Sequence, residues 1–507
     1  MNLLSSTAVF SFFTLISRVL GYLRDIMIAI FLGASVYADA FFVAFRLPNT
    51  FRRLFAEGTF NAAFIPSYTS ERLKSNIKAD KFAKEVLTLL VIILFILVLL
   101  VEIFTPFIVY LIAPGFIANA IKFDLAVELT KITFPFLFLV SISSLFAGIL
   151  NSNNKFAAAA AAPIILNIIL ILSLIISYYY KSDFVKNLSY GVTLSGLLQL
   201  LFLIYFCRKY FKPSIEFKKK ISNKVKFFLK KLVPSILSSG VTQINILVGT
   251  IIASFQAGAV SYLYYADRVY QINLAIAGIA VGTVSLPVLA NAIKKNNNST
   301  ITKIQNKSIE LSLLLSVPAA AGLIIGSEEI ISALFGYGSF SIEDVSLTSK
   351  ALKLFGLGIP AFALIKILSN FYFARDNTKV PFHLSIIIVS INVLVSLIFF
   401  KEFGFLIIPF ATTLSTWIGV IFYVYLLLDK KYLNFLSLTF KNLFKIFLST
   451  LLMSFILYYG LDYYSDKLEY SNTFKFLYLL FVVIIAAILY LFSCYFTGVL
   501  KYKSFKA

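Results

Sequence analysis

The 507-residue sequence has few charged residues, one histidine and two cysteines. Charged residues make up 13% of it and apolar residues 60%, and the mean hydropathy is +0.91, far outside the range of soluble globular proteins. With His383 alone, a histidine-based metal site or histidine dyad lacks the residues it needs. Cys207 and Cys494 show neither metal-ligand spacing nor a disulfide framework. These shortages point to a membrane protein.

Several motifs of membrane-bound enzymes and pumps are also missing. The sequence has no GxxxxGK[ST] phosphate-binding loop, which argues against ATP-driven pumping. It has no paired carboxylates of the DDxxD kind, with which membrane prenyl transferases hold Mg²⁺. The N-terminus lacks a basic segment before its first apolar run, so we expect the first span to be retained rather than cleaved. We therefore expect neither enzymatic activity nor a cofactor, and any coupling ion stays unidentified.

Long hydrophobic runs separated by polar breaks dominate what is present. A helical crossing needs about 20 apolar residues, and we count 14 such runs. This predicts an all-α polytopic membrane protein with 14 transmembrane helices.

The net charge of +22 is unevenly distributed along the chain. Most of the 45 lysines and arginines fall in alternate loops, including the stretch 208–231, if the N-terminus is cytoplasmic. This bias predicts that both termini face the cytoplasm. The excess charge is then a topology signal and an attraction to anionic membrane lipids, and it does not indicate a nucleic-acid partner.

The chain repeats itself weakly. Pro135 precedes Asn167 by 32 residues, and Pro360 precedes Asn392 by the same interval. The repeat predicts two pseudo-symmetric six-helix lobes around a central cavity, followed by two additional helices. The expected divisions are an N-terminal lobe (1–210), a cytoplasmic amphipathic linker (211–231), a C-terminal lobe (232–430) and the last two helices with the tail (431–507).

Charged residues within the first two apolar spans are the main candidates for a functional site. They are Arg18, Arg24, Asp25, Asp39, Arg46, Arg52, Arg53 and Glu57. A charge in a transmembrane helix costs about 2.5–3.5 kcal/mol on insertion scales, so it normally faces a protein interior or a watery cavity. Intervals of seven residues, which return to nearly the same helix face, join Arg18 to Asp25 and Asp39 to Arg46. The alternative is that these residues form packing ion pairs or reach towards lipid headgroups.

The acids among these residues lie beside or in register with arginines, which makes them candidate counter-ions. Arg53 and Glu57 stand four apart, an interval at which an ion pair forms easily on a helix. In the second half, the segment SYLYYADRVYQIN (261–273) places Asp267 and Arg268 within an apolar helix. The repeat aligns Arg268 with the region of Arg46, so we expect it to face the first-lobe arginines across the cavity. Because guanidinium groups match phosphate oxygens, a phosphate or diphosphate headgroup is the expected occupant.

Four segments carry a resemblance to a known family. They are SRVLGYLRD (17–25), DAFFVAFRLPNTFRRLFAEGTFNAAFIP (39–66), YYADR (264–268) and GTVSLP (282–287). They resemble the MurJ/MviN lipid II flippases, which belong to the multidrug/oligosaccharidyl-lipid/polysaccharide exporter superfamily. The resemblance covers nearly the whole chain.

The resemblance implies a bacterial inner-membrane flippase that moves lipid II, the undecaprenyl-diphosphate-linked precursor of peptidoglycan, to the outer leaflet. It implies cavity residues that bind the substrate, namely Arg18, Arg24, Arg52, Arg268 and, on family resemblance alone, Lys366, with Arg46 standing where lysine also occurs and Asp39 as a supporting acid. It also implies a first helix broken within the membrane, consistent with Gly21 and Gly33, and a groove for the lipid tail on the last two helices. Gln271 departs from the family, where an acid often follows the YYADR motif.

Alternative functions remain open at this point. The nearest are a flippase for another polyprenyl-linked glycan and a cation-coupled drug antiporter, although an antiporter is expected to have unpaired acids in its cavity. A membrane-bound glycosyl or prenyl transferase lacks its carboxylate cluster, and a scaffold has no need of an arginine-lined cavity.

Overall fold

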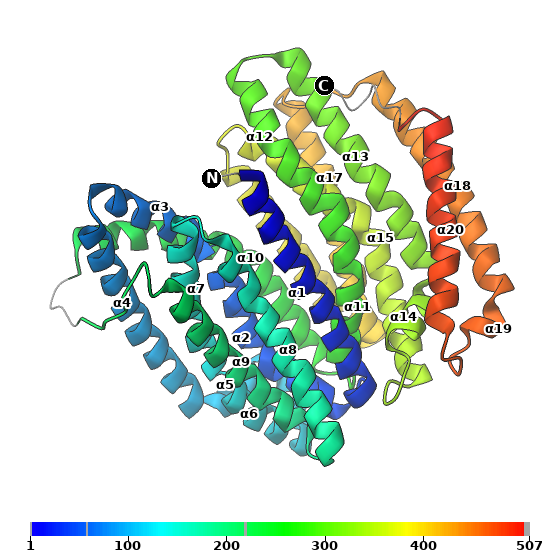
Figure 1. The fold of residues 1–507 in the computed structure, drawn as a ribbon. Coiled ribbons are helices and arrows are strands. Elements are labelled where there is room, and N and C mark those ends of the chain that lie inside the picture. Colours follow the sequence, from blue (N-terminus) through cyan, green and yellow to red (C-terminus); the bar gives the residue numbers. More distant parts are fainter. Residues whose placement is uncertain (1–2, 57–58, 217–220, 501–507) are drawn as a thin grey trace. The chain divides into compact units, whose positions relative to one another are not determined.

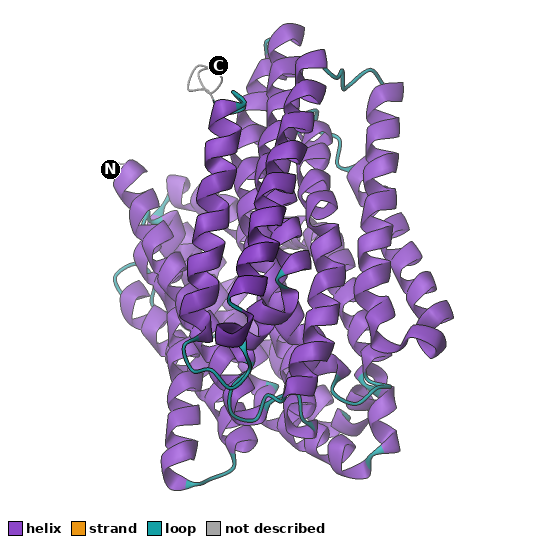
Figure 2. Ribbon diagram, turned by 90° about the vertical axis from the view of Figure 1, so that its right-hand side faces the viewer, coloured by secondary structure: helices purple, strands orange, loops and turns teal. Residues whose placement is uncertain are grey.

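The computed structural model describes residues 3–56, 59–216 and 221–500 of the chain. Throughout these residues the secondary structure is helical and no strand occurs (Figure 2). The chain forms two compact units, Met1–Ser261 and Tyr262–Ala507, which are described separately below. Membership of the all-α class is therefore confirmed.

The first unit is built from ten helices and the start of an eleventh (Figure 1). They are α1 (Leu3–Leu32), α2 (Val36–Ala56), α3 (Thr59–Lys74), α4 (Asn76–Ile103), α5 (Thr105–Ile112), α6 (Ala120–Thr133), α7 (Pro135–Ser152), α8 (Phe156–Tyr180), α9 (Phe184–Cys207), α10 (Asn223–Ala253) and α11 (Ala259–Leu274). Helix α1 packs along α8, α8 packs on α9, and α2 packs on α6 and α7. These contacts bring Arg24, Asp25 and Asp39 into the interior of this unit.

Helix α1 is continuous, which corrects the expectation of a break within it. Gly21 lies inside the helix, where a Cβ atom would stand 3.7 Å from the side chain of Asn167. A Cβ atom at this distance would make an ordinary van der Waals contact, so the packing of α1 on α8 does not require a glycine at this position. Gly33, with φ of 62°, ends the helix instead, because glycine adopts this left-handed conformation without steric cost.

The second unit continues from α11 and ends with the C-terminal helices. After a π-helical turn at Ala275–Ala280, its helices are α12 (Val281–Lys294), α13 (Asn298–Ile325), α14 (Ser327–Phe335), α15 (Ile342–Phe373), α16 (Lys379–Phe403), α17 (Ile407–Asp429), α18 (Ser437–Tyr463), α19 (Ser465–Leu468) and α20 (Lys475–Phe496). Helix α15 lies between α13 and α17, and α18 packs on α13 and α20.

Nine segments of the described residues are long and apolar enough to span a membrane. Two of them join neighbouring helices, since 120–152 covers α6 and α7 and 379–429 covers α16 and α17. The chain is therefore a multi-pass membrane protein, and the count of 14 crossings stays a prediction.

The segment expected to be a cytoplasmic amphipathic linker is helical in its second half, and its position at the membrane surface stays a prediction. Its second half is the first part of α10, which runs on without a break to Ala253. Val225 and Phe228 are buried, and the Phe228 ring packs edge-on against the rings of Phe60 and Phe82. Val225 and Phe228 therefore pack towards α3 and α4, whereas Ile221 and Phe227 of the same segment are exposed.

A polar cluster joins the same segment to the end of α3. The buried carboxylate of Glu71 accepts hydrogen bonds from Lys224 and, at 2.7 Å, from Lys74. Burial disfavours the ionised form of Glu71, but the hydrogen bonds from Lys224 and Lys74 outweigh it, so its pKa lies below the ordinary value. The start of α10 is thus held to α3 by apolar packing and by charge.

Candidate functional site

Arg24 and Asp25 form a buried ion pair in the middle of the first unit, 6% and 2% exposed. The Nη2 and Nε atoms of Arg24 donate to Oδ1 of Asp25 at 2.6 and 3.0 Å. Nη1 donates to Oδ1 of Asn167 on α8 at 2.9 Å. The Asn167 amide in turn donates to the backbone oxygen of Ser17 at 2.8 Å. Ser17 lies nearly two helical turns before Arg24 on α1. These bonds fix the direction of a guanidinium group inside the unit.

The burial of Arg24 and Asp25 agrees with the sequence prediction, and the role predicted for Arg18 stays a prediction. Arg18 is exposed whereas Asp25 is buried, although the seven-residue interval places both residues on nearly the same face of the continuous helix α1. The adjacent Arg24 takes the carboxylate instead. The two residues differ in burial because they lie about 10 Å apart along the helix, and neighbouring helices do not cover the whole length of α1.

Asp39 forms a second buried centre and has no exposed side-chain surface. Its Oδ2 atom accepts from Lys122 Nζ at 2.5 Å and from the Gly258 amide at 2.9 Å. Its Oδ1 atom accepts from the amide and the hydroxyl of Ser261, at 2.9 and 2.6 Å. Gly258 and Ser261 lie at the start of α11, where amide groups have no partner within the helix, so the carboxylate caps α11.

The expected pairing of Asp39 with an arginine is therefore wrong, since its basic partner is Lys122. The ammonium group of Lys122 also lies 4.1 Å from the centre of the Phe116 ring, and its side chain is 6% exposed. Lys122 is a partner that the sequence alone does not reveal, because nothing near it in the sequence distinguishes a buried lysine from an exposed one.

The remaining charges of the second span are less fully described. Arg46 and Arg52 are half-buried, and Arg52 Nε donates to Asn49 Oδ1 at 3.0 Å. The side chain of Arg53, and Glu57 altogether, lie outside the described residues. The expected Arg53–Glu57 ion pair stays a prediction.

In the second unit the predicted residues lie on α11 and α15. Arg268 is half-buried, and its Nη2 atom donates to the Tyr264 hydroxyl at 2.9 Å. Its Cζ atom lies 4.8 Å from the Tyr264 ring centre, within the range of a cation–π contact. Gln271 donates to the carboxylate of Asp267, so the residue that departs from the family pattern is a partner of this acid. Lys366 is exposed on α15.

Metal ligands do not gather in the described part of the chain, where no group of three or more His, Cys, Asp or Glu residues is close enough to hold an ion. Cys207 and Cys494 are buried and are not bonded to each other. The chemistry that the site offers is fixed charge and hydrogen bonding.

The apolar helices and the ionised groups buried among them define a multi-pass α-helical membrane protein. Residues 28–481 match the family model of the lipid II flippase MurJ. The chain is 37% identical to a probable lipid II flippase MurJ of Rhizobium tropici over 80% of this chain and 78% of that protein. It is 33% identical to one of Buchnera aphidicola subsp. Baizongia pistaciae over 100% and 99% of the two chains. The chain belongs to the MurJ lipid II flippase family.

Solved structures agree with this assignment. A lipid II flippase MurJ in an inward closed conformation matches with a TM-score of 0.82 and 30% identity, over 96% of this chain and 98% of that chain. An inward-facing multidrug resistance transporter of the MATE family matches with a TM-score of 0.66 and 15% identity, over 81% and 93% of the chains. The match to the MATE transporter shows a similar fold and nothing more, because only 15% of the residues are identical.

Proposed function

We propose that this protein moves lipid II from the inner to the outer leaflet of the bacterial inner membrane by alternating access. The observation that carries the proposal is the excess of positive charge on α1 and α2, which contain five arginines and two aspartates. Each aspartate already has a basic partner, Arg24 for Asp25 and Lys122 for Asp39. A diphosphate headgroup is the complementary anion, and guanidinium groups match its oxygens. No covalent bond is made or broken in such transport.

The proposed architecture has 14 crossings, with both termini in the cytoplasm. The two lobes are 1–210 and 232–430, joined by 211–231 and followed by the lipid-tail helices in 431–507. The alternation of apolar runs and the charge bias of the loops support this arrangement. The proposed substrate-binding residues are Arg18, Arg24, Arg46, Arg52, Arg268 and Lys366, with Asp25, Asp39, Glu57 and Asp267 as supporting acids.

Depletion tests the proposal at the level of the cell. When the protein is depleted, lipid-linked peptidoglycan precursor is expected to accumulate on the inner leaflet. Accumulation of a different polyprenyl-linked glycan, with normal export of lipid II, would favour the alternative flippase. Sensitivity to cationic drugs with normal levels of both lipids would favour an antiporter.

Substitution of Arg24 tests the site itself. Arg24→Ala is expected to abolish transport while the protein stays in the membrane, and Arg268→Ala is expected to do the same from the second unit. Lys401→Gln, which removes an exposed cation at the end of α16, serves as the control. Full transport by a variant without both arginines would refute the proposed site.

The membrane potential is a proposed source of energy for resetting the charged site. Moving one elementary charge across a potential of 100 mV changes the free energy by about 2.3 kcal/mol. Flipping in sealed vesicles is therefore expected to slow when the potential is collapsed at constant ion composition. An unchanged rate would remove the potential from the mechanism.

A further inference from the structure

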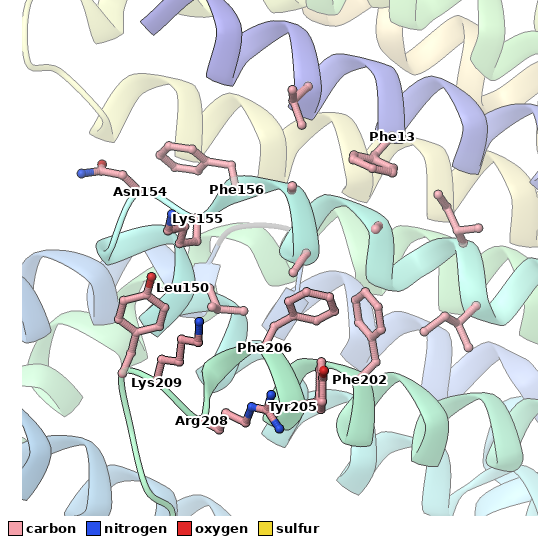
Figure 3. Close-up of a pocket in the computed structure, with 17 residues that line it drawn as sticks. Phe13, Leu150, Asn154, Lys155, Phe156, Phe202, Tyr205, Phe206, Arg208 and Lys209 are labelled. Carbon is pink, nitrogen blue, oxygen red and sulfur yellow. The ribbon is translucent and has the colours of Figure 1, made fainter. Parts of the chain in front are cut away.

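A groove of about 880 Å³ opens on the first unit (Figure 3). It is lined by α1, α8 and α9 and by the residues next to the start of α8 and the end of α9. We call it the α1–α8–α9 groove. None of the residues described above as candidate site residues lines it. Its volume falls within the range of about 300–1,000 Å³ that is usual for small-molecule sites.

The long wall of this groove is apolar and aromatic. Phe13 of α1, Ile164 and Ile165 of α8, and Phe202 and Phe206 of α9 contribute to it. Phe206 is 45% exposed, although a ring of this size normally avoids water. Only 33% of the α8 span and 39% of the α9 span is buried within the protein, so much of both helices is left for lipid. Both helices therefore leave apolar side-chain surface uncovered along the groove.

One end of the groove is cationic. Lys155 directly precedes α8, whereas Arg208 and Lys209 directly follow α9, so these neighbouring helices bring all three cations to the same end. Figure 3 shows them grouped away from Phe13 and Phe202. The guanidinium carbon of Arg208 lies 4.1 Å from the Tyr205 ring centre, a cation–π contact that limits its freedom.

Acidic residues are missing from this end. No aspartate or glutamate lines the groove, and Lys155, Arg208 and Lys209 form no ion pair with the part of the chain that the structure describes. Asn154 and Tyr210 add an amide and a hydroxyl beside the three cations. The groove thus combines an apolar channel with hydrogen-bond donors and positive charge at its mouth.

We propose that the α1–α8–α9 groove binds an anionic glycerophospholipid of the surrounding membrane. One acyl chain lies along the aromatic wall, and the phosphate accepts hydrogen bonds from Arg208, Lys209 and Lys155. The charge bias of the loops places this end at the cytoplasmic face, where anionic lipids attract basic groups. The bound lipid covers exposed rings and neutralises three neighbouring cations, so it stabilises the contact of α1 with α8 and α9. This binding does not depend on which substrate the protein transports.

Native mass spectrometry of the full-length protein in detergent tests the proposal. The protein is titrated with phosphatidylglycerol or, at the same concentrations, with zwitterionic phosphatidylethanolamine of the same acyl composition. One phosphatidylglycerol is expected to be retained in preference to phosphatidylethanolamine. Arg208→Gln/Lys209→Gln is expected to lower the retained fraction at least about tenfold, because each cation near an anionic lipid contributes to binding. Lys294→Gln/Lys295→Gln, the control, removes two exposed adjacent cations of the second unit and is expected to leave retention unchanged.

A second variant tests the apolar part of the groove without changing charge. Ala161, half-buried in the groove wall, is replaced by phenylalanine, which fills the channel. Retention of phosphatidylglycerol is expected to fall as in the charge variant. Equal retention of both lipids, or equal losses in the 208/209 and 294/295 variants, would overturn the proposal. Complete, one-for-one displacement of phosphatidylglycerol by added lipid II would also overturn it, because the groove would then be a substrate subsite.

Discussion

Asn167 on α8 accepts a hydrogen bond from Arg24 on α1, with 2.9 Å between Oδ1 and Nη1, although 143 positions separate the two residues in the chain. Asn167 is 5% exposed and also donates to the backbone of Ser17. It therefore acts on Arg24 from outside α1 and sets the direction in which the guanidinium group points. Transport that depends on Arg24 is expected to depend on this amide.

Replacing Asn167 with leucine keeps the approximate volume and removes the hydrogen bonds. The change leaves a buried donor of Arg24 unsatisfied and is expected to lower stability by about 1–3 kcal/mol. If a similar free energy is lost from anion binding, the apparent affinity for lipid II falls about tenfold or more. Lipid II binding and thermal unfolding of the purified protein measure the two effects.

Asn392, the counterpart of Asn167 in the internal repeat, provides a matched control. It is also 5% exposed, and its amide oxygen accepts from the hydroxyls of Ser396 and Thr412 at 3.4 Å. Asn392→Leu is expected to lower stability but to leave the affinity for lipid II unchanged. An equal loss of affinity in both variants would contradict a specific role for Asn167.

Removing the ammonium group that pairs with Asp39 is expected to be costly. Breaking a buried ion pair from one side typically costs about 3–5 kcal/mol, because the other charge is left without compensation. Lys122→Met is expected to lower the unfolding temperature markedly, and a second change, Asp39→Asn, is expected to recover part of the loss. Lys186→Met, which breaks the solvent-exposed pair with Glu128, is expected to cost about 0–1 kcal/mol. No recovery in the double variant would show that Lys122 acts through packing alone.

Glu71 is expected to make stability depend on acid. Its pKa in the folded protein lies below the ordinary 4.5, so its contribution to stability is complete above about pH 4.5. It is lost as the pH falls through the folded-state pKa, because the folded and unfolded states then bind the same number of protons. Unfolding curves from about pH 7 down to about pH 3 are expected to show a shallower acid-induced decline for Glu71→Gln than for the unaltered protein. Replacing the exposed Glu402 with glutamine is expected to leave the slope unchanged.

Gly115 lies against the backbone that connects α10 to α11. A Cβ atom at this position would stand 2.4 Å from the backbone oxygen of Ser254, a distance that forces the chain to move. Gly115→Ala is expected to destabilise the first unit by about 1–3 kcal/mol. Gly322 on α13 has no atom within 4 Å of the same position, so Gly322→Ala is expected to stabilise its helix by about 0.5–1 kcal/mol. Thermal unfolding of both variants checks the opposite signs.

The sequence was sufficient to predict the helical fold, because crossing a membrane requires long apolar runs that local composition reveals. It also identified Arg24, Asp25 and Asp39 as buried, since charges within such runs have few alternatives to the interior. These predictions depend on the cost of placing a residue in hydrocarbon, and that cost is largely a property of the residue and its neighbours.

The partners of these residues were much less predictable. Asn167 stood out as a repeat landmark, but no local pattern pairs it with Arg24, and Lys122 resembled any other loop cation. Helical spacing joined Arg18 to Asp25, yet the structure leaves Arg18 exposed, because burial is decided by the helix that packs on α1. Tertiary contacts between distant segments determine these pairings.

The four hydrogen bonds to Asp39 have a consequence for biogenesis. Lys122 follows Asp39 by 83 residues, whereas Gly258 and Ser261 follow it by 219 and 222. A ribosome that has just delivered α6 has therefore supplied the lysine but none of the backbone donors. The Asp39 carboxylate therefore has only one of its four hydrogen bonds until α10 and the start of α11 have been synthesised. The first unit is thus completed only when its last residues have been made, about halfway through synthesis of the chain, and chains truncated before residue 258 are expected to be favoured substrates of membrane quality control.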